Sequence, residues 1–203
     1  MDRKAVSLFA IGQVCFVVGV VVCVLLKPVG LGANFGISYY GTFDQTFLPY
    51  ALGLLGPAVF SLAAVRYIHA NKFWVLNLGI MAFSFLAAVI TFTPYSLNNL
   101  MYLLHTTAGI ILFSLQIILT WWLIAKLHWR KWAVALGIIE FLAGLAAAVY
   151  VLPAHGFLIQ SQIIFQLAFG LLVILSLSHL ADASSPEETK LQAIKAAGKV
   201  IRT

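Results

Sequence analysis

Charged residues are scarce in this chain. They make up 9% of its 203 residues, with only six acids, whereas hydrophobic residues make up 63%. A soluble domain of ordinary composition carries charge on about a quarter of its residues. The composition therefore excludes such a domain and points to a chain that lives in a membrane.

Cysteine is also scarce, and its spacing excludes thiol-redox chemistry. Cys15 and Cys23 are the two cysteines, eight residues apart in one apolar stretch. On a helix they would lie about 12 Å apart along the axis, beyond the roughly 7 Å between Cα atoms that a disulfide tolerates. The chain also has no CxxC motif.

Several other kinds of site lack the residues they need. No Lys lies inside an apolar stretch, so a retinal Schiff base has no attachment point. A haem held by two histidines lacks a second one, since only His105 reaches into the apolar region. His69, His128 and His179 have no acid or Cys beside them to complete a metal site. The chain also lacks a recognisable nucleophile elbow for Ser/His/Asp catalysis. We therefore predict no cofactor and no metal, and lean against an enzyme.

Long apolar runs are what the chain does have. Six of them, at about 5–26, 47–66, 73–93, 101–125, 132–152 and 159–181, each reach the length that crosses a bilayer. They are unbroken rather than alternating, which favours helices over a barrel. The first is too long for a signal-peptide core and is expected to remain as a helix. The fold class predicted is all-α, a polytopic membrane protein of six transmembrane helices.

The cations predict the orientation of this bundle. Of twelve Lys and Arg, Lys27 alone falls in the links at one end, and eleven fall in the N-terminus, the second and fourth links and the tail. Short loops rich in Lys and Arg stay in the cytosol, so both termini are predicted to be cytoplasmic. The net charge of +6 is explained by contact with anionic lipid, and no nucleic-acid partner is expected.

Two segments outside the six predicted transmembrane helices carry patterns of their own. The tail, 184–203 after a bundle of 1–183, has Leu191, Ile194 and Ile201 on one side. This pattern predicts a short amphipathic helix on the inner leaflet, with a frayed, solvated tail as the alternative. The link at 27–46 is rich in Gly, and its Tyr39 and Tyr40 favour an ordered lid at the membrane interface over a flexible connector.

Glu140 is the one acid within an apolar stretch. An unpaired carboxylate there would cost several kcal/mol, so Glu140 must be paired, protonated or facing water. It shares a helical face with Gly137 and Gly144, and small residues mark close helix contacts. Gln13 and Gln116 fall at a similar predicted depth. We therefore expect a structural polar clamp of Gln13, Gln116 and Glu140, with a proton-coupled role for Glu140 as the alternative.

A second polar set is predicted at the end opposite the cations. His105 opens the fourth helix there, and Gln162 and Gln166 open the sixth. Together with the lid they can line a site for a lipid headgroup or another amphiphile. The predicted ligand-binding residues are His105, Gln116, Glu140, Gln162, Gln166, Tyr39 and Tyr40. The alternative is that helix ends near headgroups are simply polar.

The segment Ile37–Tyr67, ISYYGTFDQTFLPYALGLLGPAVFSLAAVRY, carries a family resemblance. It resembles the first outer loop and second helix of the damage-regulated autophagy modulator (DRAM) family and of related bacterial six-span proteins of unknown function. The matching residues are Ile37, Ser38, Gly41, Thr42, Arg66 and Tyr67, and Leu103–Phe113 is similar to the family's fourth helix. Tyr39 stands where the family has Asp, and Gln45–Thr46 where it has Pro-Glu. The resemblance implies a lipid-associated or membrane-organising protein without established catalysis.

Three functions remain open from the sequence. The first is a non-catalytic membrane module that binds a lipid or other amphiphile, or a partner protein, through the lid and His105. The second is a small proton-linked transporter that uses Glu140. The third is an accessory subunit, or a homo-oligomer, that docks through Gly12 and Gly19 of the first helix or the Ala/Gly face of the fifth.

Overall fold

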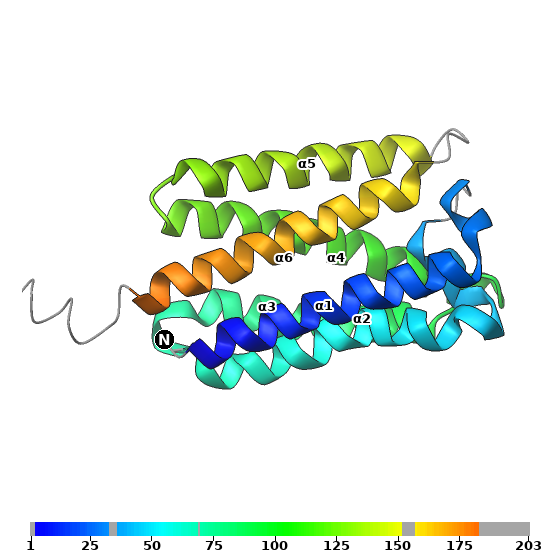
Figure 1. Cartoon of the computed structure of the whole chain (residues 1–203), viewed down its shortest axis with the longest axis horizontal. Coiled ribbons are helices and arrows are strands. Elements are labelled where there is room, and N and C mark those ends of the chain that lie inside the picture. Colours follow the sequence, from blue (N-terminus) through cyan, green and yellow to red (C-terminus); the bar gives the residue numbers. More distant parts are fainter. Residues whose placement is uncertain (1–2, 33–35, 69, 152–156, 183–203) are drawn as a thin grey trace, which may run out of the picture.

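The computed structural model describes residues 3–32, 36–68, 70–151 and 157–182. The predicted tail helix lies outside these residues. Six long helices run side by side along the molecule (Figure 1): α1 Arg3–Leu26, α2 Asp44–Ala64, α3 Ala70–Phe92, α4 Asn99–Lys126, α5 Lys131–Val151 and α6 Leu158–Asp182. In the described residues, two 3-10 helices lie between α1 and α2, η1 Pro28–Gly32 and η2 Ile37–Thr42, and a third, η3 Val65–Tyr67, lies between α2 and α3.

All six long helices are long and apolar enough to cross a membrane, and each overlaps one predicted stretch. The described part of the chain contains helices and turns and no strand. Many large apolar side chains point outward, as Leu52, Phe85 and Leu142 do. Outward apolar side chains of this kind fit a bundle surrounded by hydrocarbon rather than water.

Glycines bring α1 and α2 into close contact. A Cβ added at Gly19 would lie 2.6 Å from the Gly53 Cα and from the Pro49 carbonyl oxygen, and one at Gly12 would lie 3.0 Å from the Pro57 Cα. Small residues are what allow two helix backbones to approach in this way. Gly12 and Gly19 are therefore covered by α2, and neither offers the surface that docking through them would need.

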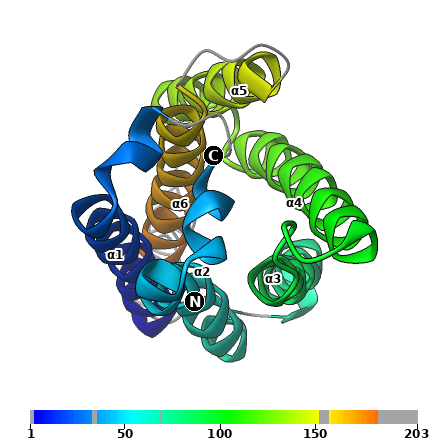
Figure 2. The same cartoon turned by 90° about the vertical axis from the view of Figure 1, so that its right-hand side faces the viewer.

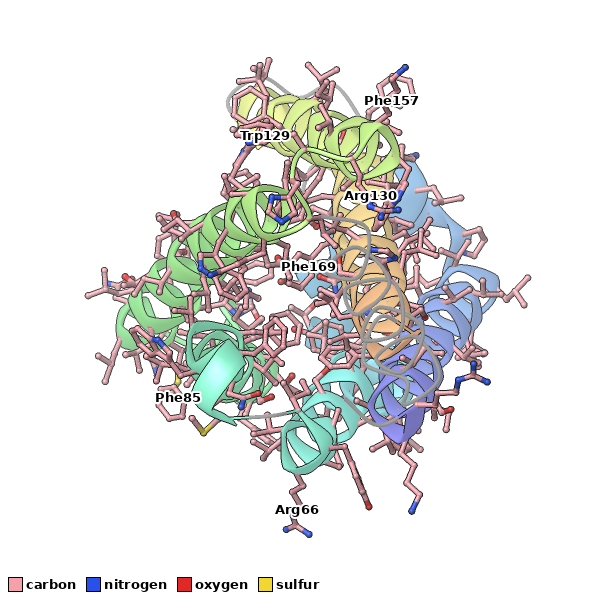
Figure 3. The ribbon with its side chains drawn as sticks, turned by 90° about the vertical axis from the view of Figure 1, so that its left-hand side faces the viewer. Arg66, Phe85, Trp129, Arg130, Phe157 and Phe169 are labelled. Carbon is pink, nitrogen blue, oxygen red and sulfur yellow. The ribbon has the colours of Figure 1, made fainter. Side chains whose placement is uncertain are left out.

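The other helices complete a ring. α2 packs on α3, α3 on α4, and α5 on α6, while α6 also contacts α1 and closes the circle (Figure 2). Side chains fill the interior: Phe113 of α4 stacks on Phe165 of α6 at 4.6 Å between ring centroids. Phe169 lies at the centre of the bundle when it is viewed along its axis (Figure 3).

The two ends of the bundle differ in charge. One end, here called the basic end, carries Arg66 and Arg130 (Figure 3), with Lys126 and Lys131 beside the α4–α5 turn. The opposite end carries η1, η2 and the α3–α4 link. Among the described residues, Lys27 is the one Lys or Arg there. We call η2, Ile37–Thr42, the cap, and we call the end of the bundle that carries it the cap end.

Candidate functional site

The cap is fastened to the bundle by side chains from three helices. The Ile37 amide donates to Gln162 Oε1 of α6 at 2.7 Å, and Ser38 Oγ lies 2.7 Å from His105 Nε2 of α4. Thr46 of α2 donates its hydroxyl to the Tyr40 carbonyl oxygen at 2.6 Å. The segment is thus folded down onto the helix ends, where Figure 2 shows it in front of the bundle.

His105 is the most connected of these side chains. Its Nδ1 lies 2.8 Å from the Thr93 carbonyl oxygen, just after the end of α3. A carbonyl can only accept, so Nδ1 carries a hydrogen. In the neutral imidazole, Nε2 then accepts from the Ser38 hydroxyl. The edge of the Tyr95 ring also packs against the imidazole, with 5.6 Å between centroids. His105 therefore joins α3, α4 and the cap.

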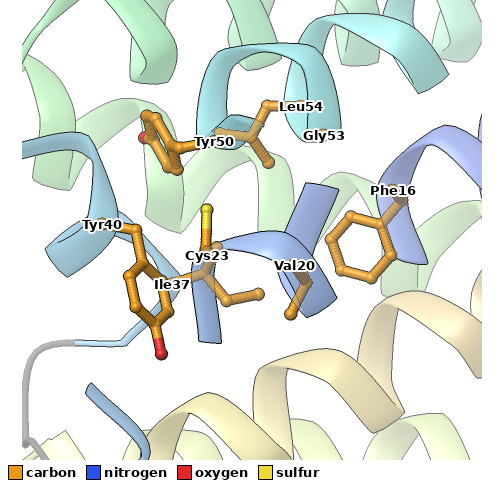
Figure 4. Close-up of a pocket in the computed structure, with 8 residues that line it drawn as sticks. All are labelled: Phe16, Val20, Cys23, Ile37, Tyr40, Tyr50, Gly53 and Leu54. Carbon is orange, nitrogen blue, oxygen red and sulfur yellow. The ribbon is translucent and has the colours of Figure 1, made fainter. Parts of the chain in front are cut away.

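An apolar pocket lies under the cap (Figure 4). Its walls come from the cap and from α1 and α2: Ile37, Tyr40, Phe16, Val20, Cys23, Tyr50, Gly53 and Leu54. Tyr40 and Tyr50 lie on either side of Cys23. The space open to the centre of a water molecule is about 10 Å³, roughly what one small group occupies. The pocket thus takes a single apolar group with the cap in place.

Tyr40 is the central side chain of the cap. It is fully buried, and its ring closely approaches Gly30 of η1, where a Cβ would lie 2.5 Å from the Tyr40 hydroxyl oxygen. That hydroxyl has no hydrogen-bond partner, and burial raises the pKa of Tyr40. Nearby, the Lys27 ammonium lies over the ring of Phe43 and 5.6 Å from the ring centroid of Tyr39. The cation at this end is thus held by aromatic rings.

The polar residues inside the bundle pair differently from our expectation. Thr120 of α4 donates its hydroxyl to Glu140 Oε2 at 2.5 Å, and Gln116 donates to Gln166 Oε1 at 2.7 Å. Glu140 is fully buried, and its Oε1 has no partner. The predicted clamp of Gln13, Gln116 and Glu140 is thus replaced by two separate pairs. The reason is register: Glu140 meets the residue one helical turn beyond Gln116.

Gln13 of α1 belongs to neither pair and makes a separate contact. Its amide packs against Gly170 of α6, where an added Cβ would come within 2.5 Å of it. Its Oε1 is buried without a partner. Gln13 and Gln166 line a second small cavity, together with Ser61 of α2, in which the space open to a water centre is again about 10 Å³. The space is about the size of one water molecule, and most of its lining is apolar.

The residues predicted to bind a ligand thus fall into two groups. Tyr39, Tyr40, His105 and Gln162 meet at the cap end, whereas Gln116, Gln166 and Glu140 lie within the bundle. Several partners were not among the predicted site residues: Ile37, Ser38, Thr46, Thr93 and Thr120. The sequence carries one signal for Thr120, because it continues the polar stripe of His105 and Gln116 along α4.

Metal binding has no support in the described ranges, where no three His, Cys, Asp or Glu side chains gather as a metal site requires. No protein-family model, curated protein or solved structure matches the chain. The resemblance to the DRAM family therefore stays a prediction, and the function must be argued from the site itself.

Proposed function

We propose that this chain is an integral membrane protein that binds membrane lipid at its cap end. The observation that carries the proposal is the apolar pocket between α1, α2 and the cap, lined by side chains such as Val20, Tyr50 and Leu54. Acyl chains are the commonest apolar ligand in the surroundings of a membrane bundle.

The fastening of the cap gives the pocket a means of opening. With the cap closed, the space takes one group of about the size of a methyl. A longer stretch of acyl chain requires the cap to move away from α1 and α2, and this breaks its bonds to Gln162 of α6 and Thr46 of α2.

The orientation that we propose puts the cap end outside and both termini in the cytosol. The support is the charge distribution, with Arg66, Lys126, Arg130 and Lys131 at the basic end and Lys27 alone among the described cations at the cap end. Lipid would then be bound from the outer leaflet, with Lys27 as the described cation at that end that could meet a headgroup phosphate.

The test uses the full chain in lipid nanodiscs that contain a phospholipid with a photoreactive group near the end of its acyl chain. We expect adducts on the pocket residues, mapped by mass spectrometry. Val20→Phe fills the pocket and should remove those adducts. Val21→Phe, on the neighbouring residue whose side chain is 49% exposed, is the matched control and should keep them. Adducts confined to the outer surface of the helices, or equal pocket adducts in both variants, would contradict lipid binding there.

One observation favours a second function, proton-linked transport. Glu140 is fully buried, with one carboxyl oxygen bonded to Thr120 and the other unpartnered, and an acid inside a membrane bundle is a candidate proton carrier. Proteoliposomes loaded with a pH-sensitive dye test it. Proton uptake by the wild type that Glu140→Gln abolishes would support transport, and equal traces for the two proteins would exclude it.

A further inference from the structure

Ser38 and His105 have the geometry of a nucleophile and its base. Ser38 Oγ lies 2.7 Å from His105 Nε2, and the Thr93 carbonyl oxygen holds Nδ1 on the far side of the ring at 2.8 Å. An activated serine needs a base within hydrogen-bonding reach and a third group that orients that base. In serine hydrolases the third group is a carboxylate. Here the Thr93 carbonyl takes the place of that carboxylate, and it lies just after the end of α3, at the negative end of the helix dipole.

An apolar space lies beside this pair. Ile37, the neighbour of Ser38 in the cap, lines the apolar pocket together with Tyr40 and Tyr50, so the serine adjoins a space suited to an acyl chain. Ser38 and His105 are both only half-buried, which leaves them within reach of a substrate.

We propose that Ser38 and His105 form a catalytic pair that hydrolyses an acyl ester of a membrane lipid. The substrate class rests on the proposed lipid binding, whereas the pair rests on its own geometry. Neither residue belongs to the interior set of Gln116, Gln166 and Glu140.

The reaction balances with the ester and one water molecule. Ser38 Oγ attacks the ester carbonyl carbon as its proton passes to His105 Nε2, and the carbonyl oxygen becomes an oxyanion. The carbon–alkoxy bond then breaks, the leaving alcohol takes the proton from His105, and the acyl group stays on Ser38. Water attacks this acyl-serine with His105 again as the base, releasing the fatty acid and restoring the hydroxyl.

The test is covalent labelling of the full chain in detergent with an alkyl fluorophosphonate, followed by mapping of the modified residue. We expect an adduct on Ser38 of the wild-type protein. Ser38→Ala should remove it, and Ser96→Ala, on an exposed serine of the α3–α4 link, should leave it unchanged. Replacing the base with His105→Gln or His105→Asn should slow labelling by about 10²-fold or more.

Folding is monitored for each variant by its thermal unfolding midpoint, and mapping on the wild-type chain decides the nucleophile even if a variant unfolds. The proposal is overturned if Ser38 carries no adduct, or if folded His105 variants label as fast as the wild type. Loss of the Ser38 adduct with pocket crosslinks to the photoreactive lipid intact would refute only the catalytic pair. Labelling of Ser38 without any pocket crosslinks would instead refute lipid binding in the pocket.

Discussion

At the scale of single residues, burial decides what each polar side chain does. Glu140 has one partner, Thr120, and no cation is described beside it. A buried polar group without a partner costs about 1–3 kcal/mol, so the Thr120 hydrogen bond is the contact that makes Glu140 tolerable in the bundle. The same reasoning explains why Gln116 is paired with Gln166.

Truncation of Glu140 is expected to destabilise the fold. Glu140→Ala removes the acceptor of Thr120 and leaves a cavity, which together should cost about 2–4 kcal/mol. Glu140→Gln keeps the shape and an acceptor oxygen, and should cost less than about 1 kcal/mol. The measurement is the thermal unfolding midpoint in one detergent. Leu142→Ala, on a side chain 57% exposed, is the control and should have little effect; equal losses for Glu140→Ala and Leu142→Ala would contradict the assignment.

At the scale of elements, the contact between α1 and α2 depends on glycine. Gly19 and Gly53 face each other across the two backbones, and Pro49 and Pro57 lie within α2 on the same contact. Since two backbones can meet this closely only without side chains between them, these glycines fix how near α2 lies to α1. They thereby set the width of the pocket that both helices line.

The glycines of the chain offer a matched pair for testing this contact. Gly19→Ala puts a Cβ against backbone atoms of α2 at 2.6 Å, and this overpacking should cost about 1–3 kcal/mol. Gly109→Ala adds a Cβ with nothing within 4 Å and should gain up to about 1 kcal/mol from helix propensity. Unfolding midpoints that move in opposite directions confirm the contact. A neutral Gly19→Ala would mean that α1 and α2 are not held this closely.

The cap is the other element whose behaviour can be predicted. Gln162→Leu keeps the bulk of the side chain but removes the acceptor of the Ile37 amide, so amide exchange across Ile37–Thr42 should become faster. Hydrogen–deuterium exchange read by mass spectrometry measures it. Gln45→Leu, on an exposed residue of α2, is the control and should leave the exchange of the cap unchanged. Equal cap protection in Gln162→Leu and the wild type would show that this bond does not hold the cap.

At the scale of the whole molecule, the charge difference between the two ends of the bundle predicts its orientation in the membrane. Six apolar helices can be inserted in either sense, and the excess of Lys and Arg at the basic end favours keeping that end in the cytosol. On this proposal the cap and its pocket face the outside.

Labelling of single cysteines tests this orientation. In a chain with Cys15→Ala and Cys23→Ala, a membrane-impermeant maleimide on intact cells should label Ser96→Cys at the cap end. It should fail to label Trp129→Cys in the α4–α5 turn until the membrane is opened. Both positions are exposed in the structure, so accessibility within the protein does not bias the result. The reverse pattern would place the cap in the cytosol.

The sequence identified many of the residues that form the site, but it did not show which of them pair with one another. His105, Gln162 and Tyr40 stood out because polar and aromatic side chains near the end of an apolar run are informative by themselves. The predicted partner of Glu140 was wrong because a depth estimated along two helices is uncertain by about one turn, or 5.4 Å. Gln116 and Thr120 are separated by one such turn on the same face of α4.

The sequence by itself determined the number of helices and their approximate limits, because the length of an apolar run must match the thickness of a bilayer. Only the tertiary structure decided which residues meet. Ser38 and His105 are separated by 67 positions, and their contact depends on how the cap folds back over α3 and α4. No local pattern encodes that contact, since it is set by the packing of the helix ends, and the catalytic pair that we propose depends on it.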